Sequence, residues 1–311
     1  MGSVGGAGMT FVEHNNRKRA NTFAEYITGS ELRKYTAEKV KKYCGDNPSV
    51  FDGAGGSGQL EQFIQPSVFT AVEIQNEACE VLQENYPSAN VINNDFFVHN
   101  ETERYDAIVM NPPFSLQFKE QSEEAKNGIQ KLFPWKKSGK VDDIFMLKSL
   151  QYSKRYGFYI MFPGIAYRSL ELKMRELIGN QLLELNTIEN AFEDTPISVI
   201  FIVIDKEKTS DECSRELYDC KAKKQLASDR WKIDYEKWEQ IRIEVEKEEI
   251  DIDFVNSELD RVVLDRLENH LARQLMVIQT FQADVNYLGF ISEAYDILNK
   301  YELYYNFGGS T

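Results

Sequence analysis

The tetrapeptide Asn111-Pro112-Pro113-Phe114 follows an apolar run, residues 107–110, that is typical of a buried strand. Neither proline can donate a hydrogen bond to a neighbouring strand, so the strand ends here and the turn is stiff. A strand end by itself needs only a turn former such as Gly or Asp. An amide fixed beside an aromatic ring therefore indicates chemistry as well as chain reversal.

These residue types suit the activation of an amino group on a nucleic-acid base. Such a nitrogen is a poor nucleophile, because its lone pair is delocalised into the ring. Asn111 Oδ1 and the Pro112 carbonyl can accept both N–H bonds, and the stiff turn would hold them in place. Positive charge growing on the nitrogen would meet dipoles already aimed at it. Phe114 would stack on the base, and no general base is needed because the proton leaves after transfer.

Three further signals lie where successive predicted strands end. Asp52 opens a glycine turn that lets the backbone approach a ligand closely. Glu73 ends the next strand, where a carboxylate can accept both hydroxyls of a ribose. Asp95 can accept from an adenine amino group, although an Asx turn would also explain it. Ligands of open α/β sheets bind at strand carboxyl ends, so the sequence predicts an adenosyl ligand held by Asp52, Gly56, Gly58, Glu73, Asp95 and Phe96.

Helical and strand patterns alternate between residues 30 and 205. The alternation predicts an α/β fold with a doubly wound, largely parallel Rossmann-like sheet covered on both faces. A helix start is also expected directly after the glycine turn. The predicted helices are 30–44, 76–87 and 142–153, and the predicted strands are 49–51, 69–75, 89–97, 105–110, 157–164 and 197–205.

The order of VFDGAGGSGQL, AVEIQ, NNDFF and NPPF resembles the gamma-class methyltransferases that act on adenine N6 in DNA. The resemblance covers about residues 30–205. It implies S-adenosyl-L-methionine as cofactor, base flipping, and a place in a restriction-modification or mobile-element system. It also places Thr36, in RKYT, beside the cofactor and Phe192 against the flipped base. Similar tetrads occur in enzymes that modify RNA bases, so RNA adenine stays an alternative, as does a catalytically idle binding module.

Charge is unevenly distributed along the chain. The net formal charge is −14, and residues 205–311 carry 15 Lys and Arg against 24 Asp and Glu. Lysines follow the tetrapeptide between residues 119 and 140, and they are expected either to track phosphates or to be a solvated loop. A leucine stripe at 259–275 predicts an amphipathic helix. It is expected to form core or to dock a specificity subunit or a second copy of the chain.

Composition bounds the remaining expectations. No apolar run approaches the length of a transmembrane helix, which is about 20 residues. The four cysteines and three histidines lack zinc-ligand spacing, which predicts no metal site. A cytoplasmic protein with reduced thiols is expected. The predicted domains are a cloning remnant at 1–8, an N-terminal arm at 9–29, a catalytic domain at 30–205, and an acidic, mainly helical region at 206–311.

Overall fold

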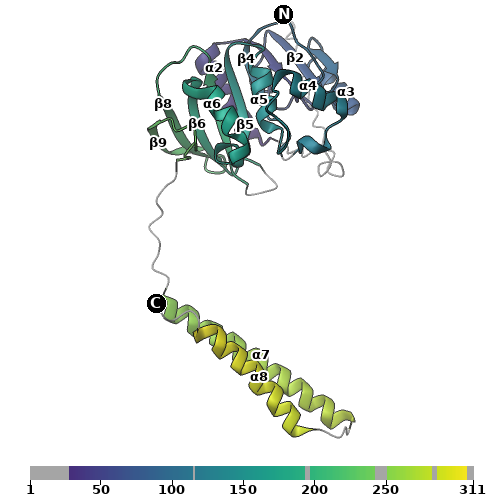
Figure 1. The fold of residues 1–311 in the computed structure, drawn as a ribbon, viewed down its shortest axis with the longest axis vertical. Coiled ribbons are helices and arrows are strands. Elements are labelled where there is room, and N and C mark those ends of the chain that lie inside the picture. Colours follow the sequence, from purple (N-terminus) through teal and green to yellow (C-terminus); the bar gives the residue numbers. More distant parts are fainter. Residues whose placement is uncertain (1–27, 115, 193–196, 242–250, 282–285, 307–311) are drawn as a thin grey trace, which may run out of the picture. The chain divides into compact units, whose positions relative to one another are not determined.

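The chain divides into two compact units, Met1–Ile243 and Glu244–Thr311 (Figure 1). The first unit holds a large sheet, and the second contains two helices in its described part. This division lies later than the predicted boundary at residues 205–206, because two strands that follow residue 205 belong to the sheet. The computed structural model describes residues 28–114, 116–192, 197–241, 251–281 and 286–306.

Within the described residues one nine-stranded sheet has the order β3-β2-β1-β4-β5-β7-β6-β8-β9. The strands β1 to β5 are parallel where they pair. β7 lies antiparallel between β5 and β6, β8 is parallel to β6, and β9 is antiparallel at the edge. Their bounds are β1 Ser49–Asp52, β2 Val68–Glu73, β3 Asn90–Asn93, β4 Tyr105–Met110, β5 Ser153–Met161, β6 Leu182–Glu189, β7 Val199–Asp205, β8 Glu212–Asp219 and β9 Lys224–Lys232.

Helices cover both faces of this sheet (Figure 1). Side chains alternate across a strand, so Phe51 packs in the core cluster that contains Ile144, whereas Val50 packs in the cluster that contains Leu32. This doubly wound, mostly parallel arrangement confirms the predicted fold class. The α-helices of the unit are α2 Ser30–Cys44, α3 Asn76–Asn85, α4 Glu123–Leu132, α5 Asp142–Leu150 and α6 Leu172–Ile178, and the 3₁₀ turns are Phe118–Glu120, Pro163–Ala166, Ser169–Glu171 and Gly179–Gln181.

One local expectation was wrong, and one strand was not predicted. The glycine turn leads into turns at residues 60–64 with short-range bonds such as Ile64 N to Glu61 O, and no regular helix starts there. The strand β6 was not predicted, because the polar residues Glu184 and Asn186 interrupt its apolar pattern. Both side chains are buried nevertheless.

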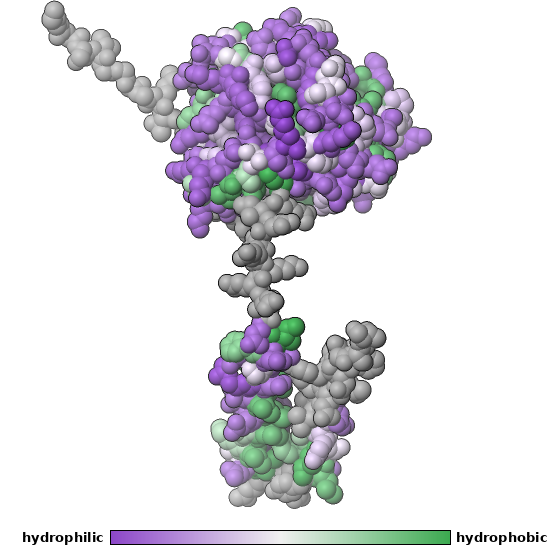
Figure 2. All heavy atoms as spheres, turned by 90° about the vertical axis from the view of Figure 1, so that its left-hand side faces the viewer, coloured by the Kyte–Doolittle hydropathy of each residue, from purple (hydrophilic) through white to green (hydrophobic). Residues whose placement is uncertain are grey.

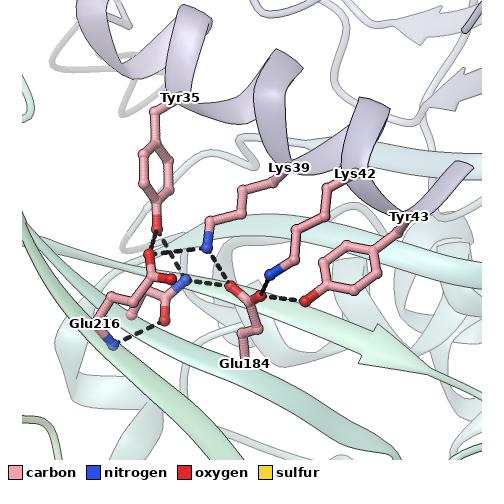
Figure 3. A network of polar contacts seen from close by, with 7 residues as sticks. Tyr35, Lys39, Lys42, Tyr43, Glu184 and Glu216 are labelled. Carbon is pink, nitrogen blue, oxygen red and sulfur yellow. Dashed lines mark hydrogen bonds and ion pairs between the residues drawn. The ribbon is translucent and has the colours of Figure 1, made fainter. Parts of the chain in front are cut away.

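A polar network explains how β6 buries these side chains (Figure 3). Lys39 Nζ on α2 donates to Glu184 Oε2 at 2.6 Å and to Glu216 Oε2 on β8 at 2.8 Å. Lys42 Nζ donates to Glu184 Oε1 at 2.7 Å, and the Tyr43 hydroxyl donates to the same oxygen. Burial raises the pKa of Glu184, but these cations and donors outweigh it and lower that pKa to about 2. The network therefore fixes α2 on β6 and β8.

The second unit is a helical hairpin of α7 Ile252–Phe281 and α8 Tyr287–Asn306 (Figure 1). No described residue of α7 is buried. Hydrophobic side chains lie exposed on this unit (Figure 2), among them Phe254, Leu264, Met276 and Phe281. Neither of these helices, nor any other helix in the described residues, is long and apolar enough to cross a membrane.

Candidate active site

The predicted site residues converge on one edge of the sheet. β1, β2 and β4 end at Asp52, Glu73 and Met110, and the parallel pairing puts these ends on the same side. Asp95 comes two residues after the end of β3, and Asn111 follows β4 directly. Across this edge the four positions follow the order Asp95, Glu73, Asp52 and Asn111, from β3 through β2 and β1 to β4.

Glu73 holds the glycine turn from the neighbouring strand. Its Oε2 accepts the Gly56 amide at 2.9 Å, and its Oε1 accepts the Gln75 amide at 2.9 Å. Gly56 has φ 51° and Gly58 has φ 75°, a backbone region that glycine adopts without strain. Each carboxylate oxygen can accept more than one hydrogen bond. Glu73 can therefore support the turn and also receive ribose hydroxyls.

Two buried carboxyl groups lie at the base of the turn. Asp52 Oδ1 accepts the Ala54 amide at 2.8 Å, and Asp52 lies within hydrogen-bonding reach of Glu61, which has no exposed surface. Burial raises the pKa of Asp52 to about 7 and that of Glu61 well above its usual range. Near neutral pH the pair can share a proton. A cationic group beside the pair would offset the electrostatic cost of burying it, as the ammonium group of an adenosyl-methionine ligand could do.

A buried lysine holds the loop that carries Asp95. Lys148 Nζ on α5 donates to the carbonyls of Phe96, Phe97 and His99 at 2.6, 3.0 and 2.6 Å. Burial lowers the pKa of Lys148 to about 8. Asp95 Oδ1 accepts the Phe97 amide at 2.8 Å, so this oxygen makes the Asx turn that was the structural alternative.

Phe96 is a core residue, although the sequence predicted that it holds the cofactor. Its ring stacks on Phe145 at 5.2 Å between centroids, and it is 4% exposed. A Cβ added at Gly53 would meet the same ring at 2.5 Å, so Phe96 packs directly under the start of the glycine turn. The structure thus explains Gly53 by this close approach. Adenine stacking by Phe96 stays a prediction.

Asn111 is oriented by a residue that the sequence analysis missed. Its Nδ2 donates to the Thr28 hydroxyl at 2.9 Å. Thr36, predicted beside the cofactor, is instead fully buried, and its hydroxyl donates to the Leu32 carbonyl of its own helix at 2.8 Å. One sequence feature could have drawn attention to Thr28: Thr28-Gly29 directly precedes the predicted helix start at Ser30.

Phe114, in the turn after β4, lies close to two other aromatic rings. Phe114 lies 6.4 Å from Phe162 and 6.4 Å from Phe192 between ring centroids, and the contact with Phe192 is edge-on. The predicted pair Phe114 and Phe192 is therefore brought together. Phe162, which the analysis missed, directly follows β5, the neighbour of β4 in the sheet. Lys140 Nζ lies 5.3 Å from the centre of the Phe162 ring.

The predicted basic segment separates into different environments. Lys136 is 2% exposed, and its Nζ donates to both oxygens of Asp143 at 2.7 Å, so it cannot track phosphates. Lys126 pairs with Glu123 at 2.8 Å. Lys119, Lys131 and Lys137 are exposed. A second basic stretch predicted from the sequence, NNRKRA at residues 15–20, lies outside the described residues.

Comparison with known protein families identifies the family of this chain. The model of the N-6 DNA methylases matches residues 79–253, which is more than half of the chain. The chain belongs to the N-6 DNA methylase family. This confirms the predicted family, that of adenine-specific DNA methyltransferases, and it implies the use of S-adenosylmethionine. A comparison with curated proteins finds no match.

Solved structures share the fold of this family member. One is the methyltransferase subunit of a type I restriction-modification system from Streptococcus thermophilus, with a TM-score of 0.53 and 18% identity over 64% of this chain and 49% of that chain. Another is a modification subunit of a proposed type I restriction enzyme from Vibrio vulnificus, with a TM-score of 0.50 and 15% identity over 65% and 51%. The chain thus spans about half the length of these two structures.

Proposed function

We propose that this chain transfers a methyl group from S-adenosylmethionine to the N6 amino group of adenine in DNA, as the modification component of a restriction-modification system. The observation that carries the proposal is the Asn111 amide at the end of β4, with its nitrogen bonded to Thr28. Its oxygen can then face a target amino group. Family membership supports DNA as substrate, and the similar structures from type I restriction-modification and restriction enzymes support the restriction-modification role.

The residues around Asn111 would position the base. Adenine in a duplex must leave the stack to reach this edge of the sheet. Phe114 would stack on it, with Phe192 and Phe162 as the other walls. Because Phe114 and Phe192 touch edge-on, an entering base would have to displace that contact. Asn111 Oδ1 and the Pro112 carbonyl would hold the two N–H bonds, and Pro113 would stiffen the turn.

The cofactor would lie along the ends of β1, β2 and β3. Glu73 would accept the ribose hydroxyls, Asp95 the adenine amino group, and the pair Asp52 and Glu61 the ammonium end. When bound, S-adenosylmethionine supplies the methyl group. This placement brings the methyl donor next to the turn after β4. Methyl transfer from radiolabelled cofactor, tried in parallel on duplex DNA, single-stranded DNA and RNA, tests the function, and label in RNA alone would contradict it.

We expect Glu73→Ala to weaken cofactor binding by about 10- to 150-fold, the equivalent of roughly 1.5–3 kcal/mol for hydrogen bonds to a charged acceptor. Part of the loss comes from release of the Gly56 amide, because Glu73 holds the turn as well as the ligand. Calorimetry with S-adenosylhomocysteine measures the affinity. Glu80→Ala, an exposed glutamate on α3, is the matched control. Unchanged affinity in folded Glu73→Ala protein would remove Glu73 from the site.

We propose further that the α7–α8 hairpin docks on a different protein chain. Its exposed apolar side chains have no covering element among the described residues of its own unit. Residues 244–311 contain five Lys and Arg against fourteen Asp and Glu, a net charge of −9. A second copy would bring two such charges together, which favours a basic partner over self-association. A similar structure, with a TM-score of 0.56, concerns complex assembly of a type I system.

The isolated chain is therefore expected to sediment as a monomer and to methylate DNA slowly with little sequence preference, because recognition would be shared with the partner. Analytical ultracentrifugation gives the mass, and sequencing of methylated positions gives the preference. Leu264→Glu, at an exposed apolar position, should leave both results unchanged. A monomer that methylates one defined sequence efficiently would contradict the partner proposal, and so would a stable dimer that Leu264→Glu dissociates.

A further inference from the structure

The carboxamide of Asn111 has a donor end and an acceptor end, and only one orientation serves the proposed chemistry. The terminal torsion of asparagine is broad, so the covalent structure alone does not choose between the two. With Nδ2 toward the substrate, two donors would face each other and the target amino group would be repelled. Something outside Asn111 must therefore set the orientation.

Thr28 is placed to do this. Its hydroxyl lies 2.9 Å from Asn111 Nδ2 and can accept the hydrogen bond. Thr28 is 4% exposed, so water competes little for that bond. In this structure the Thr28 hydroxyl accepts from the donor end of the amide, which leaves Oδ1 for the substrate.

Thr28 is itself held by the cofactor side of the site. Its carbonyl accepts from Arg33 Nε at 2.6 Å. The same guanidinium donates to Gln62 Oε1 at 2.9 Å and to Gln59 Oε1 at 3.1 Å. Gln59 and Gln62 flank Glu61 in the turns that follow Gly58. A continuous set of contacts thus joins the glycine turn to the catalytic amide.

The helix that carries Arg33 cannot easily shift. Its other end is fixed by the network of Lys39, Lys42 and Tyr43 on Glu184 (Figure 3). Thr28 and Gly29 directly precede this helix, and the Gly29 carbonyl accepts the Arg33 amide at 3.1 Å. The position of the Thr28 hydroxyl is therefore set by α2, which is anchored at both ends.

We propose that Thr28 is a positioning residue, whose hydroxyl keeps Asn111 Oδ1 turned toward the target amino group, and that Arg33 ties Thr28 to the glycine turn. The inference rests on the proposed function of Asn111. Thr28 touches neither substrate nor cofactor in this role. Its effect must therefore pass through Asn111. The experiment accordingly compares the effect of removing the Thr28 hydroxyl with and without Asn111.

Thr28→Val keeps the shape of the side chain and removes the hydroxyl. We expect a fall of about 10- to 100-fold in kcat, the scale of loss from a misplaced catalytic group, with KM for DNA and cofactor affinity nearly unchanged. Thr28→Ser should recover most of the rate, because it restores the hydroxyl. If Thr28→Val disturbs the fold, Thr28→Ala gives a second measurement of kcat without the hydroxyl. Thr209→Val, at an exposed threonine, is the matched control.

The decisive comparison repeats Thr28→Val in the Asn111→Ala background. If Thr28 acts through Asn111, the second substitution should have no further effect on the rate. An equal loss in both backgrounds would overturn the inference, and so would full activity of Thr28→Val. If Asn111→Ala alone is as active as wild type, the proposed function of Asn111 fails instead. Melting temperature and calorimetric cofactor binding accompany each variant.

Discussion

Asn111→Ala is expected to slow methyl transfer by about two orders of magnitude or more, as when one preorganised transition-state contact is removed. The substitution deletes the acceptor oxygen, while Pro112 and Pro113 keep the turn. Folding and cofactor binding should therefore survive. Single-turnover transfer of a radiolabelled methyl group to duplex DNA measures the rate of the chemical step without the contribution of product release.

A matched substitution separates this effect from a general loss of asparagine. Asn100→Ala removes an exposed asparagine from a loop of the same unit, and it should leave the rate unchanged. Calorimetry checks that both variants bind cofactor alike. If Asn111→Ala and wild type transfer methyl groups equally fast, the tetrapeptide has no catalytic role and the site lies elsewhere.

Lys136→Ala should destabilise the fold by roughly 3–5 kcal/mol, the range for breaking a buried ion pair by removing one partner. Asp143 would be left without its cation in a fully buried place. Lys137→Ala, one residue later, should leave the melting temperature unchanged, because Lys137 is exposed. If Lys137 contacts a phosphate, its loss should instead flatten the salt dependence of DNA binding by about one unit of slope.

The destabilisation should depend on pH. Burial, with Asp142 and Glu171 nearby, already raises the pKa of Asp143 to about 7 despite Lys136. Removing Lys136 raises it further. A carboxyl whose folded pKa is raised stabilises the fold at low pH, and that stabilisation is lost as pH rises through the folded value. Urea unfolding should therefore show a larger loss at pH 8 than at pH 6.

A double variant serves as control for the buried pair. Lys136→Met with Asp143→Leu removes both charges and should recover much of the stability, since apolar replacements of a buried pair are often neutral or stabilising. A Lys136→Ala protein as stable as wild type at pH 8 would mean that the ion pair contributes nothing. A Lys137→Ala protein with unaltered salt dependence would make that residue part of a solvated loop.

Short-range patterns in the sequence were sufficient for the central strands and for the edge where they end. β4 is apolar from residue 107 to 110 and β7 is apolar from residue 199 to 204, and the turn residues that follow β4 mark its end. The pairing of Phe114 with Phe192 also agrees with the resemblance that suggested it.

Contacts between segments far apart in the chain explain the features that short-range sequence patterns did not reveal. Glu184 in β6 is buried because Lys39, 145 residues earlier, neutralises it. Lys136 was expected on a basic surface, but it is buried because its ammonium group pairs with Asp143. Thr28 was missed for a similar reason, because only the fold shows that its hydroxyl reaches Asn111 at the end of β4.

The most direct test of the central claim is the identity of the methylated nucleoside. Duplex DNA is incubated with the full chain and S-adenosylmethionine carrying a deuterated methyl group, then digested and analysed by mass spectrometry. The account predicts labelled N6-methyladenine, strongly reduced with Asn111→Ala. Labelled N4-methylcytosine would leave the activation of an amino group intact and contradict the adenine assignment. Labelled nucleoside from RNA but none from DNA would contradict the claim itself.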